Sequence, residues 1–181
     1  SDTEVLVEAL DAWGVDRTLR EVDGMFAFVA YDSLERVLWL CRDRFGEKPL
    51  FFFRNEDVLV FASEIRALEA VPDLDLDIDT EGLRQILEFG YSIGEITIYR
   101  GVCRVLAGTA TRVDLRSGSS SILRYWDVVD EARSARSLAA PTDPVGELQA
   151  ALFDSVRSRM VSDVPLGAFL SGGIDSSLVV A

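Results

Sequence analysis

Small and polar residues near the end of the chain are spaced as in a loop that binds a phosphate group. Residues 168–179 place the run Ser-Gly-Gly-Ile-Asp-Ser-Ser between two apolar stretches. Adjacent glycines let the backbone approach an anion, successive N–H groups form a concave donor site, and serine hydroxyls can donate further hydrogen bonds. We therefore expect a strand, a phosphate-binding loop and a helix that starts near Asp175, with its positive dipole end at the anion. The phosphate ligands expected are Ser171, Gly172, Gly173, Asp175, Ser176 and Ser177.

This loop lacks the lysine of a Walker loop, which follows the pattern Gly-x-x-x-x-Gly-Lys-Ser/Thr. The only lysine of the chain is Lys48, far away in the sequence. Dipoles, a metal ion or cations from outside the chain must therefore balance the phosphate charge. Asp175 suits a Mg²⁺ ligand, because a carboxylate beside a polyphosphate is repelled unless a cation bridges the two. The alternative is a tight Gly-Gly turn capped by aspartate and serine.

The same residues resemble a known family. Residues 162–177 are similar to the pyrophosphate loop of the N-type ATP pyrophosphatases, and specifically to that of glutamine-hydrolysing asparagine synthetases. Four earlier blocks resemble, in order, the glutaminase half of that family, and they are residues 1–4, 24–28, 42–50 and 62–65. Ordered blocks are far more specific than any single one, and together they span nearly the whole chain.

The resemblance implies an ATP-dependent carbon–nitrogen ligase that uses glutamine, aspartate and ATP, with Mg²⁺. Glutamine would be hydrolysed at an N-terminal cysteine, and its ammonia would pass to a second site. There ATP would adenylate the aspartate side chain with release of pyrophosphate, and ammonia would displace AMP to give asparagine. A dry path would keep ammonia from being protonated and lost.

Three further site residues follow from the resemblance alone. Asp2 matches the aspartate that holds the α-ammonium group of glutamine, although an acid is also favoured in the first turn of any helix. Leu170 would border the nucleotide. Met25 and Leu170 would line the ammonia path, and the alternative is that both pack in separate cores.

The chain lacks parts that the family needs, so we expect no catalytic residue within it. The nucleophilic cysteine and the Asn-Gly-Glu block are absent, and neither Cys41 nor Cys103 can replace a cysteine whose own α-amino group is the base. Many relatives have Pro-Pro-Gly where this chain has Leu-Ala-Gly at residues 106–108. The ends indicate an internal segment of a longer enzyme that is inactive alone. Two alternative identities for the parent protein stay open. One is a β-lactam synthetase-like or other carboxylate-adenylating relative, and the other is a non-catalytic regulatory homologue.

Composition narrows the class of protein. The 181 residues carry a net charge of −13, which argues against nucleic-acid binding because that function needs a basic surface. Histidine is absent, which excludes Ser-His-Asp and Cys-His catalysis within the chain. Two separated cysteines favour a reducing compartment, no signal peptide is visible, and no apolar run reaches ~18 residues. We expect a cytoplasmic protein without a membrane span, and a homodimeric parent is one option.

Periodicity predicts an α+β domain over residues 1–130, a linker over 131–144 and the start of a second domain over 145–181. We expect a helix that is capped by Ser1 and stopped by Gly14, a second after Asp79 that ends near Gly90, and a third that starts at Asp143 and Pro144. The strands expected are residues 25–31, 37–41, 49–53 and 58–62, forming an antiparallel meander, and residues 109–115 and 122–128, forming a hairpin. By resemblance, the first domain is an incomplete antiparallel fold of the N-terminal-nucleophile hydrolase kind. The second is the first strand, loop and helix of an α/β nucleotide-binding domain.

Two charged segments receive no chemical role. Asp73, Asp75, Asp77 and Asp79 alternate, but an EF-hand would then need glycine and glutamate where this chain has isoleucine and arginine at positions 78 and 84. The run Arg-Asp-Arg at residues 42–44 is a family landmark, and we interpret it as a hairpin with a solvated ion pair.

Overall fold

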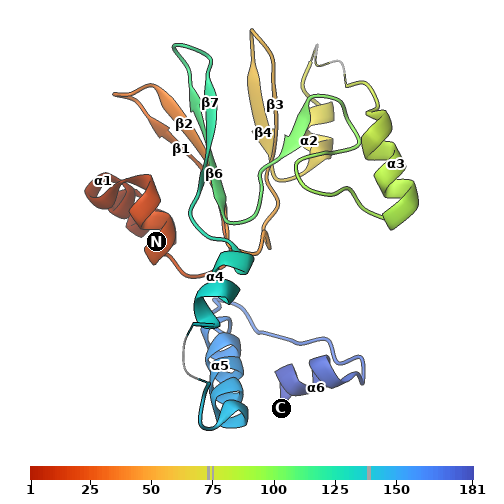
Figure 1. Ribbon diagram of the computed structural model, residues 1–181. Coiled ribbons are helices and arrows are strands. Elements are labelled where there is room, and N and C mark those ends of the chain that lie inside the picture. The colour runs from red at the N-terminus through yellow and green to blue at the C-terminus, as the bar shows by residue number, and fades with distance from the viewer. Residues whose placement is uncertain (73, 75, 138–139) are drawn as a thin grey trace. The chain divides into compact units, whose positions relative to one another are not determined.

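The computed structural model describes residues 1–72, 74, 76–137 and 140–181, and it divides into two units. The first unit is Ser1–Glu131 and the second is Ala132–Ala181 (Figure 1). Among the described residues, no helix is long and apolar enough to cross a membrane.

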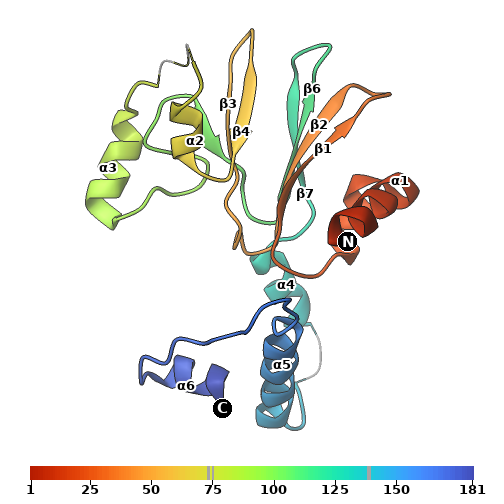
Figure 2. The ribbon, with the colours of Figure 1, turned by 180° about the vertical axis from the view of Figure 1, so that it is seen from behind.

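The first unit contains two antiparallel sheets (Figures 1 and 2). The larger sheet has the order β1 (Ala27–Asp32), β2 (Val37–Arg42), β6 (Thr109–Asp114), β7 (Ser120–Arg124). The smaller has the order β4 (Leu59–Ala62), β3 (Phe51–Arg54), β5 (Val102–Arg104). The prediction of an α+β domain with antiparallel sheets is therefore confirmed, and so is the hairpin of β6 and β7.

The predicted single meander is wrong, because β2 pairs with β6 and not with β3. The reason lies in the apolar residues on both faces of β2. Neighbouring residues of a strand point to opposite sides, and Leu40 and Cys41 are both fully buried. A strand that is buried on both faces belongs inside a layered structure, and here it separates two cores.

One core lies between the larger sheet and helix α1 (Asp2–Glu21). Its buried members are Leu19, Cys41, Ala110 and Tyr125. The other core joins the opposite face of that sheet to the smaller sheet, and its buried members are Leu40, Leu50, Val105 and Val113. Burial of such side chains stabilises the fold by about 1.5–3 kcal/mol each.

Helix α1 begins as predicted, but it continues beyond the predicted end. The Ser1 hydroxyl accepts the Glu4 N–H and the Glu4 carboxylate accepts the Ser1 N–H, which makes a capping box. Gly14 interrupts the helix with φ 74° and ψ 170°, after which helical structure resumes to Glu21. The second helical segment is stabilised by the burial of Leu19 in the core.

Two helices lie between β4 and β5 in the chain. Helix α2 (Ile65–Glu69) buries Leu68 beside β3 and β4. Helix α3 (Thr80–Phe89) has the predicted caps, since the Asp79 carboxylate accepts two backbone N–H groups and Gly90 is left-handed. A Cβ on Gly82 would lie 1.9 Å from the Thr97 carbonyl oxygen, so only glycine allows this helix to pack so closely. Of the alternating aspartates, Asp73 and Asp75 lie outside the described residues.

The remaining helices are α4 (Val128–Ala135), α5 (Pro144–Ser158) and α6 (Ile174–Val180). Helix α4 occupies part of the predicted linker. Helix α5 starts as predicted, with the Asp143 carboxylate accepting the Gly146 N–H at 3.0 Å. The strand predicted before the phosphate loop is wrong: residues 164–171 form no strand, and Phe169 is fully exposed. A strand needs a neighbour to satisfy its backbone hydrogen bonds, and the described residues of this unit include no other strand.

Candidate functional site

The predicted phosphate loop turns at a left-handed glycine and leads directly into α6. Gly172 has φ 80°, a conformation that side chains disfavour. The Ser171 and Ser176 hydroxyl oxygens lie 3.0 Å apart, so a hydrogen bond between the two side chains joins the two ends of the turn. The Ser176 and Ser177 hydroxyls donate to the Gly173 carbonyl oxygen at 3.2 and 2.8 Å. The serine hydroxyls are thus gathered at one turn, next to the start of a helix.

The first turn of α6 presents backbone N–H groups that no side chain caps. The N-cap of the helix is Gly173. The first N–H groups of a helix have no partner within it, so an anion bound here would receive backbone hydrogen bonds. A shallow surface hollow is lined by Gly172, Gly173, Ile174, Ser177, Leu178 and Ala181.

Asp175 lies in the first turn of α6 and is exposed. Mg²⁺ in nucleotide sites is usually held by one or two carboxylates together with phosphate oxygens and water. Among the described residues, no three acidic or cysteine side chains come together as a protein-only metal site would require. The donor set at this loop therefore fits a Mg²⁺ ion that a bound polyphosphate brings with it.

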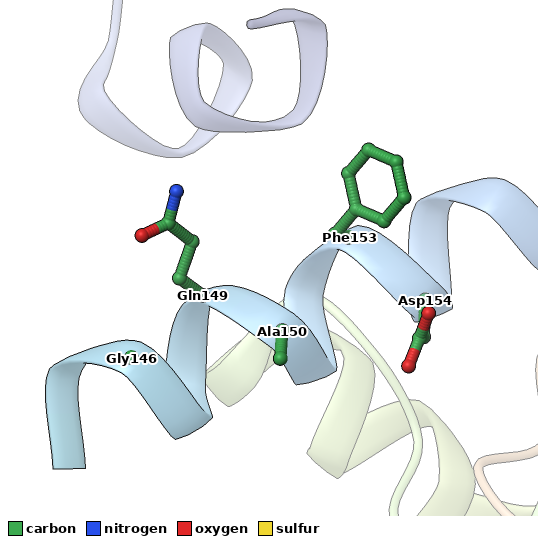
Figure 3. Close-up of a pocket in the computed structure, with 5 residues that line it drawn as sticks. All are labelled: Gly146, Gln149, Ala150, Phe153 and Asp154. Atoms are coloured by element: carbon green, nitrogen blue, oxygen red, sulfur yellow. The ribbon is translucent and has the colours of Figure 1, made fainter. Parts of the chain in front are cut away.

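A second shallow hollow lies on α5 and contains none of the predicted site residues (Figure 3). Gln149 and Phe153 are four residues apart and project from the same side of the helix, as helical periodicity requires. Asp154 is also at this hollow. The Asp154 carboxylate would repel a phosphate group and none of the lining residues carries a positive charge, so we assign the hollow no part in phosphate binding.

The residues expected to bind glutamine and to line the ammonia path lie apart in the sequence. Asp2 is exposed in the first turn of α1, and one of its oxygens accepts the Thr3 N–H at 2.8 Å. Met25 precedes β1 and is 43% exposed in the first unit, whereas Leu170 is 61% exposed in the second. Neither side chain is a core residue in its own unit. The roles of these three residues stay predictions.

Sequence reasoning missed the organisation around Asp43, where the predicted solvated ion pair is wrong. The Asp43 side chain is only 1% exposed. Its carboxylate accepts four backbone N–H groups, from Phe26, Phe45, Glu47 and Lys48, at 2.9–3.3 Å. The signal in the sequence is an aspartate placed before a turn that ends at Gly46, because such a carboxylate can accept the N–H groups that a turn leaves free.

Arg42 is held by backbone carbonyl oxygens. Its guanidinium donates to the carbonyl oxygens of Lys48, Gly46 and Val105 at 2.8, 2.6 and 2.8 Å. Burial lowers the pKa of Arg42 from its ordinary value, with a further contribution from the charge of Arg104. Arg42 and Asp43 therefore fix the backbone of one loop from two sides.

The two cysteines are unsuited to nucleophilic catalysis. Cys41 is fully buried, and burial raises the pKa of its thiol to about 12. Burial also raises the pKa of the Cys103 thiol, helped by the charge of Glu95. Because the thiolate is the reactive form, both groups stay protonated near neutral pH. That neither cysteine replaces an N-terminal nucleophile stays a prediction.

Comparison with known proteins places these features in a family. Residues 1–126 match the family described as a glutamine amidotransferase domain, and residues 147–181 match the one described as asparagine synthase. The chain belongs to the glutamine amidotransferase domain family and continues into the start of an asparagine synthase domain.

Individual relatives align over nearly the whole chain. The chain is 35% identical over 182 residues to asparagine synthetase [glutamine-hydrolyzing] 3 of Bacillus subtilis, and the match covers 100% of the chain and 28% of that protein. Asparagine synthetase [glutamine-hydrolyzing] 1 of the same organism is also 35% identical, with the same coverage. Amidase chry2 of Gibberella zeae is 29% identical over 99% of the chain and 26% of its own length. The chain thus spans little more than a quarter of these relatives.

Proposed function

We propose that the chain is part of a glutamine-hydrolysing asparagine synthetase, a ligase that makes asparagine from aspartate, ATP and the amide nitrogen of glutamine. The observation that carries the proposal is the succession of two domains on one chain. An amidotransferase domain over residues 1–126 is followed by the start of an asparagine synthase domain over residues 147–181. Two relatives with that name align over the entire chain.

In this proposal the first unit belongs to a glutaminase of the N-terminal-nucleophile kind. Asp2 binds the α-ammonium group of glutamine, since its exposed carboxylate offers a negative charge at the start of α1. The nucleophilic cysteine is supplied from outside this chain, because both thiols within it are held protonated.

The phosphate loop binds the pyrophosphate part of ATP. The hydroxyls of Ser171, Ser176 and Ser177 lie at the loop, and on binding the Ser176 and Ser177 protons would turn from the Gly173 carbonyl oxygen to phosphate oxygens. Gly172 and Gly173 bring the backbone close to the anion. Leu170 borders the nucleotide. Asp175 would hold Mg²⁺, which neutralises phosphate charge and polarises the oxygens when bound. These contacts favour loss of pyrophosphate when the acceptor carboxylate is adenylated.

Ammonia must cross between the two reactions without meeting bulk water. Met25 and Leu170 are apolar and unbranched at Cβ, so both suit the wall of such a path. Their exposure within their own units, 43% and 61%, leaves both side chains available for it.

A second candidate is a relative that amidates or cyclises another carboxylate by the same adenylation chemistry, as a β-lactam synthetase does. Amidase chry2, which aligns over 99% of the chain under a name other than asparagine synthetase, is the reason to keep it. The two candidates differ in the acceptor that supports pyrophosphate release by the full-length protein. Release with aspartate supports asparagine synthesis, and release only with another carboxylic acid supports the second candidate.

Asp175→Asn in the full-length protein tests the role of the loop. The substitution keeps the shape of the side chain and removes its charge, so synthesis is expected to fall by roughly 10²-fold or more, as when one electrostatic stabiliser is lost. Glutamine hydrolysis is expected to continue. Asp154→Asn on α5 is the matched control. Equal loss of both activities in Asp175→Asn would instead assign a folding role to Asp175.

A further inference from the structure

We propose that Asp43 is a positioning residue for ammonia transfer, because it holds the backbone beside Met25. The inference rests on the proposed function, in which Met25 lines the ammonia path. It concerns a buried carboxylate in a loop to which neither the sequence nor the proposed chemistry gives a role.

Asp43 holds Phe26, the neighbour of Met25, by both of its backbone groups. The Phe26 N–H donates to Asp43 Oδ2 at 3.3 Å. In return, the Asp43 N–H donates to the Phe26 carbonyl oxygen at 2.9 Å. The Phe26 ring packs against the core beneath α1, with its centroid 5.6 Å from that of Phe28. The peptide on the C-terminal side of Met25 is therefore fixed in place.

On the N-terminal side, the nearest anchors are the Arg20 and Val22 carbonyl oxygens, which accept from the Arg44 guanidinium at 2.8 and 2.7 Å, five and three residues before Met25. Gly24 precedes Met25 with φ 133°, a conformation that is open to glycine and rare for other residues. Among the described residues, no atom beyond its chain neighbours would lie within 4 Å of a Cβ at Gly24, so nothing packs against Gly24 on the side where a side chain would project. Phe26 is directly bonded to Met25 and is thus the anchor nearest to it, so the direction of the Met25 side chain depends most on Asp43.

The same carboxylate connects this segment to the loop that follows β2. Oδ2 also accepts the Lys48 N–H at 3.0 Å, and Oδ1 accepts the Phe45 and Glu47 N–H groups at 3.1 and 2.9 Å. The Asp43 carbonyl oxygen accepts the Gly108 N–H at 2.9 Å. A charge that is 1% exposed is costly to bury, and its four donors offset that cost. A neutral amide cannot make the same set, because its nitrogen donates where two N–H groups need an acceptor.

The decisive experiment removes one donor and leaves every side chain in place. Phenyllactic acid is inserted at position 26 of the full-length protein, so that an ester oxygen replaces the Phe26 N–H. Leucic acid at position 34 is the matched control, because the Leu34 N–H donates to the Asp32 carboxylate at 2.9 Å in the turn after β1. Glutamate, asparagine and ammonia-dependent asparagine synthesis are measured for each protein.

The ester at position 26 is expected to raise the glutamate formed per asparagine by roughly two- to tenfold, since small misplacements cost large factors. Glutaminase activity and synthesis from added ammonium should stay close to the wild-type values, and the control should leave the ratio unchanged. Asp43→Asn should raise the ratio further if it folds. An unchanged ratio at position 26, or an equal fall in all three activities, overturns the positioning role. A wild-type protein that forms no asparagine from glutamine contradicts the proposed function itself.

Discussion

Replacing Gly108 by alanine should destabilise the first unit through a clash that the structure locates. Gly108 has φ 65°, and its backbone binds Asp43, Tyr125 and Trp126. A Cβ at this position would lie 2.4 Å from the Trp126 carbonyl oxygen. A real Cβ does not approach backbone oxygen so closely, so the hydrogen bonds that Gly108 makes to residues 125 and 126 must shift.

The expected loss has three parts. The left-handed conformation costs about 1–2 kcal/mol for alanine, and the clash adds about 1–3 kcal/mol. Alanine also restricts the unfolded chain more than glycine does, which offsets about 0.4–1 kcal/mol of this loss. The free energy of unfolding should therefore fall by about 3 kcal/mol, a large share of the ~5–15 kcal/mol of a typical domain.

Gly94→Ala is the control variant, because it has the same backbone conformation without the clash. Gly94 has φ 67°, and nothing lies within 4 Å of its added Cβ, so only the conformational cost of about 1 kcal/mol remains. Urea unfolding of the wild-type chain and both variants, followed by tryptophan fluorescence, gives the two losses. If Gly108→Ala is no more destabilising than Gly94→Ala, the steric argument is wrong.

Three further predictions concern the chain as a whole. At pH 8 in the folded chain, iodoacetamide should modify the half-buried Cys103 before the fully buried Cys41, and equal rates by mass spectrometry would contradict the packing around Cys41. The N–H of Val129 lowers the pKa of Asp127 below its ordinary value of 3.8. The stability that Asp127 contributes is therefore present above pH 3.8, and it is lost as the pH falls through the lower pKa of the folded chain. The difference in unfolding free energy between wild type and Asp127→Asn should therefore shrink below pH 3.8, and a difference that stays constant down to full protonation would refute this. The 181-residue chain alone should release neither glutamate from glutamine nor pyrophosphate from ATP, and turnover would mean that the catalytic parts have been misplaced.

Local signals predicted helix ends well because they act over three or four residues. Ser1, Asp79 and Asp143 each accept backbone N–H groups at the start of a helix, as their positions in the sequence indicated. Gly90 ends α3 in the left-handed conformation for the same local reason. Gly14 broke its helix as expected, but the resumption to Glu21 depends on the burial of Leu19 against distant strands.

Non-local features were not predictable in this way. The pairing of β2 with β6 joins residues about seventy positions apart, and periodicity carries no information about which strands meet. The burial of Asp43 depends on N–H groups from Phe26, which precedes β1, and from the turn that follows Asp43. Its charged neighbours in the sequence suggested solvent exposure instead. At the phosphate loop, glycine and serine spacing predicted the turn and α6, whereas the strand before it requires neighbours that the described residues do not include.

The fate of the glutamine amide nitrogen tests the proposed function most directly. The full-length protein is incubated with glutamine labelled with ¹⁵N at the side-chain amide, together with aspartate, ATP and Mg²⁺. Asparagine labelled in its side-chain amide should form, with equal amounts of AMP and pyrophosphate. Label that remains in glutamine or in free ammonia, or release of ADP in place of AMP, would contradict the assignment of this chain to a glutamine-hydrolysing asparagine synthetase.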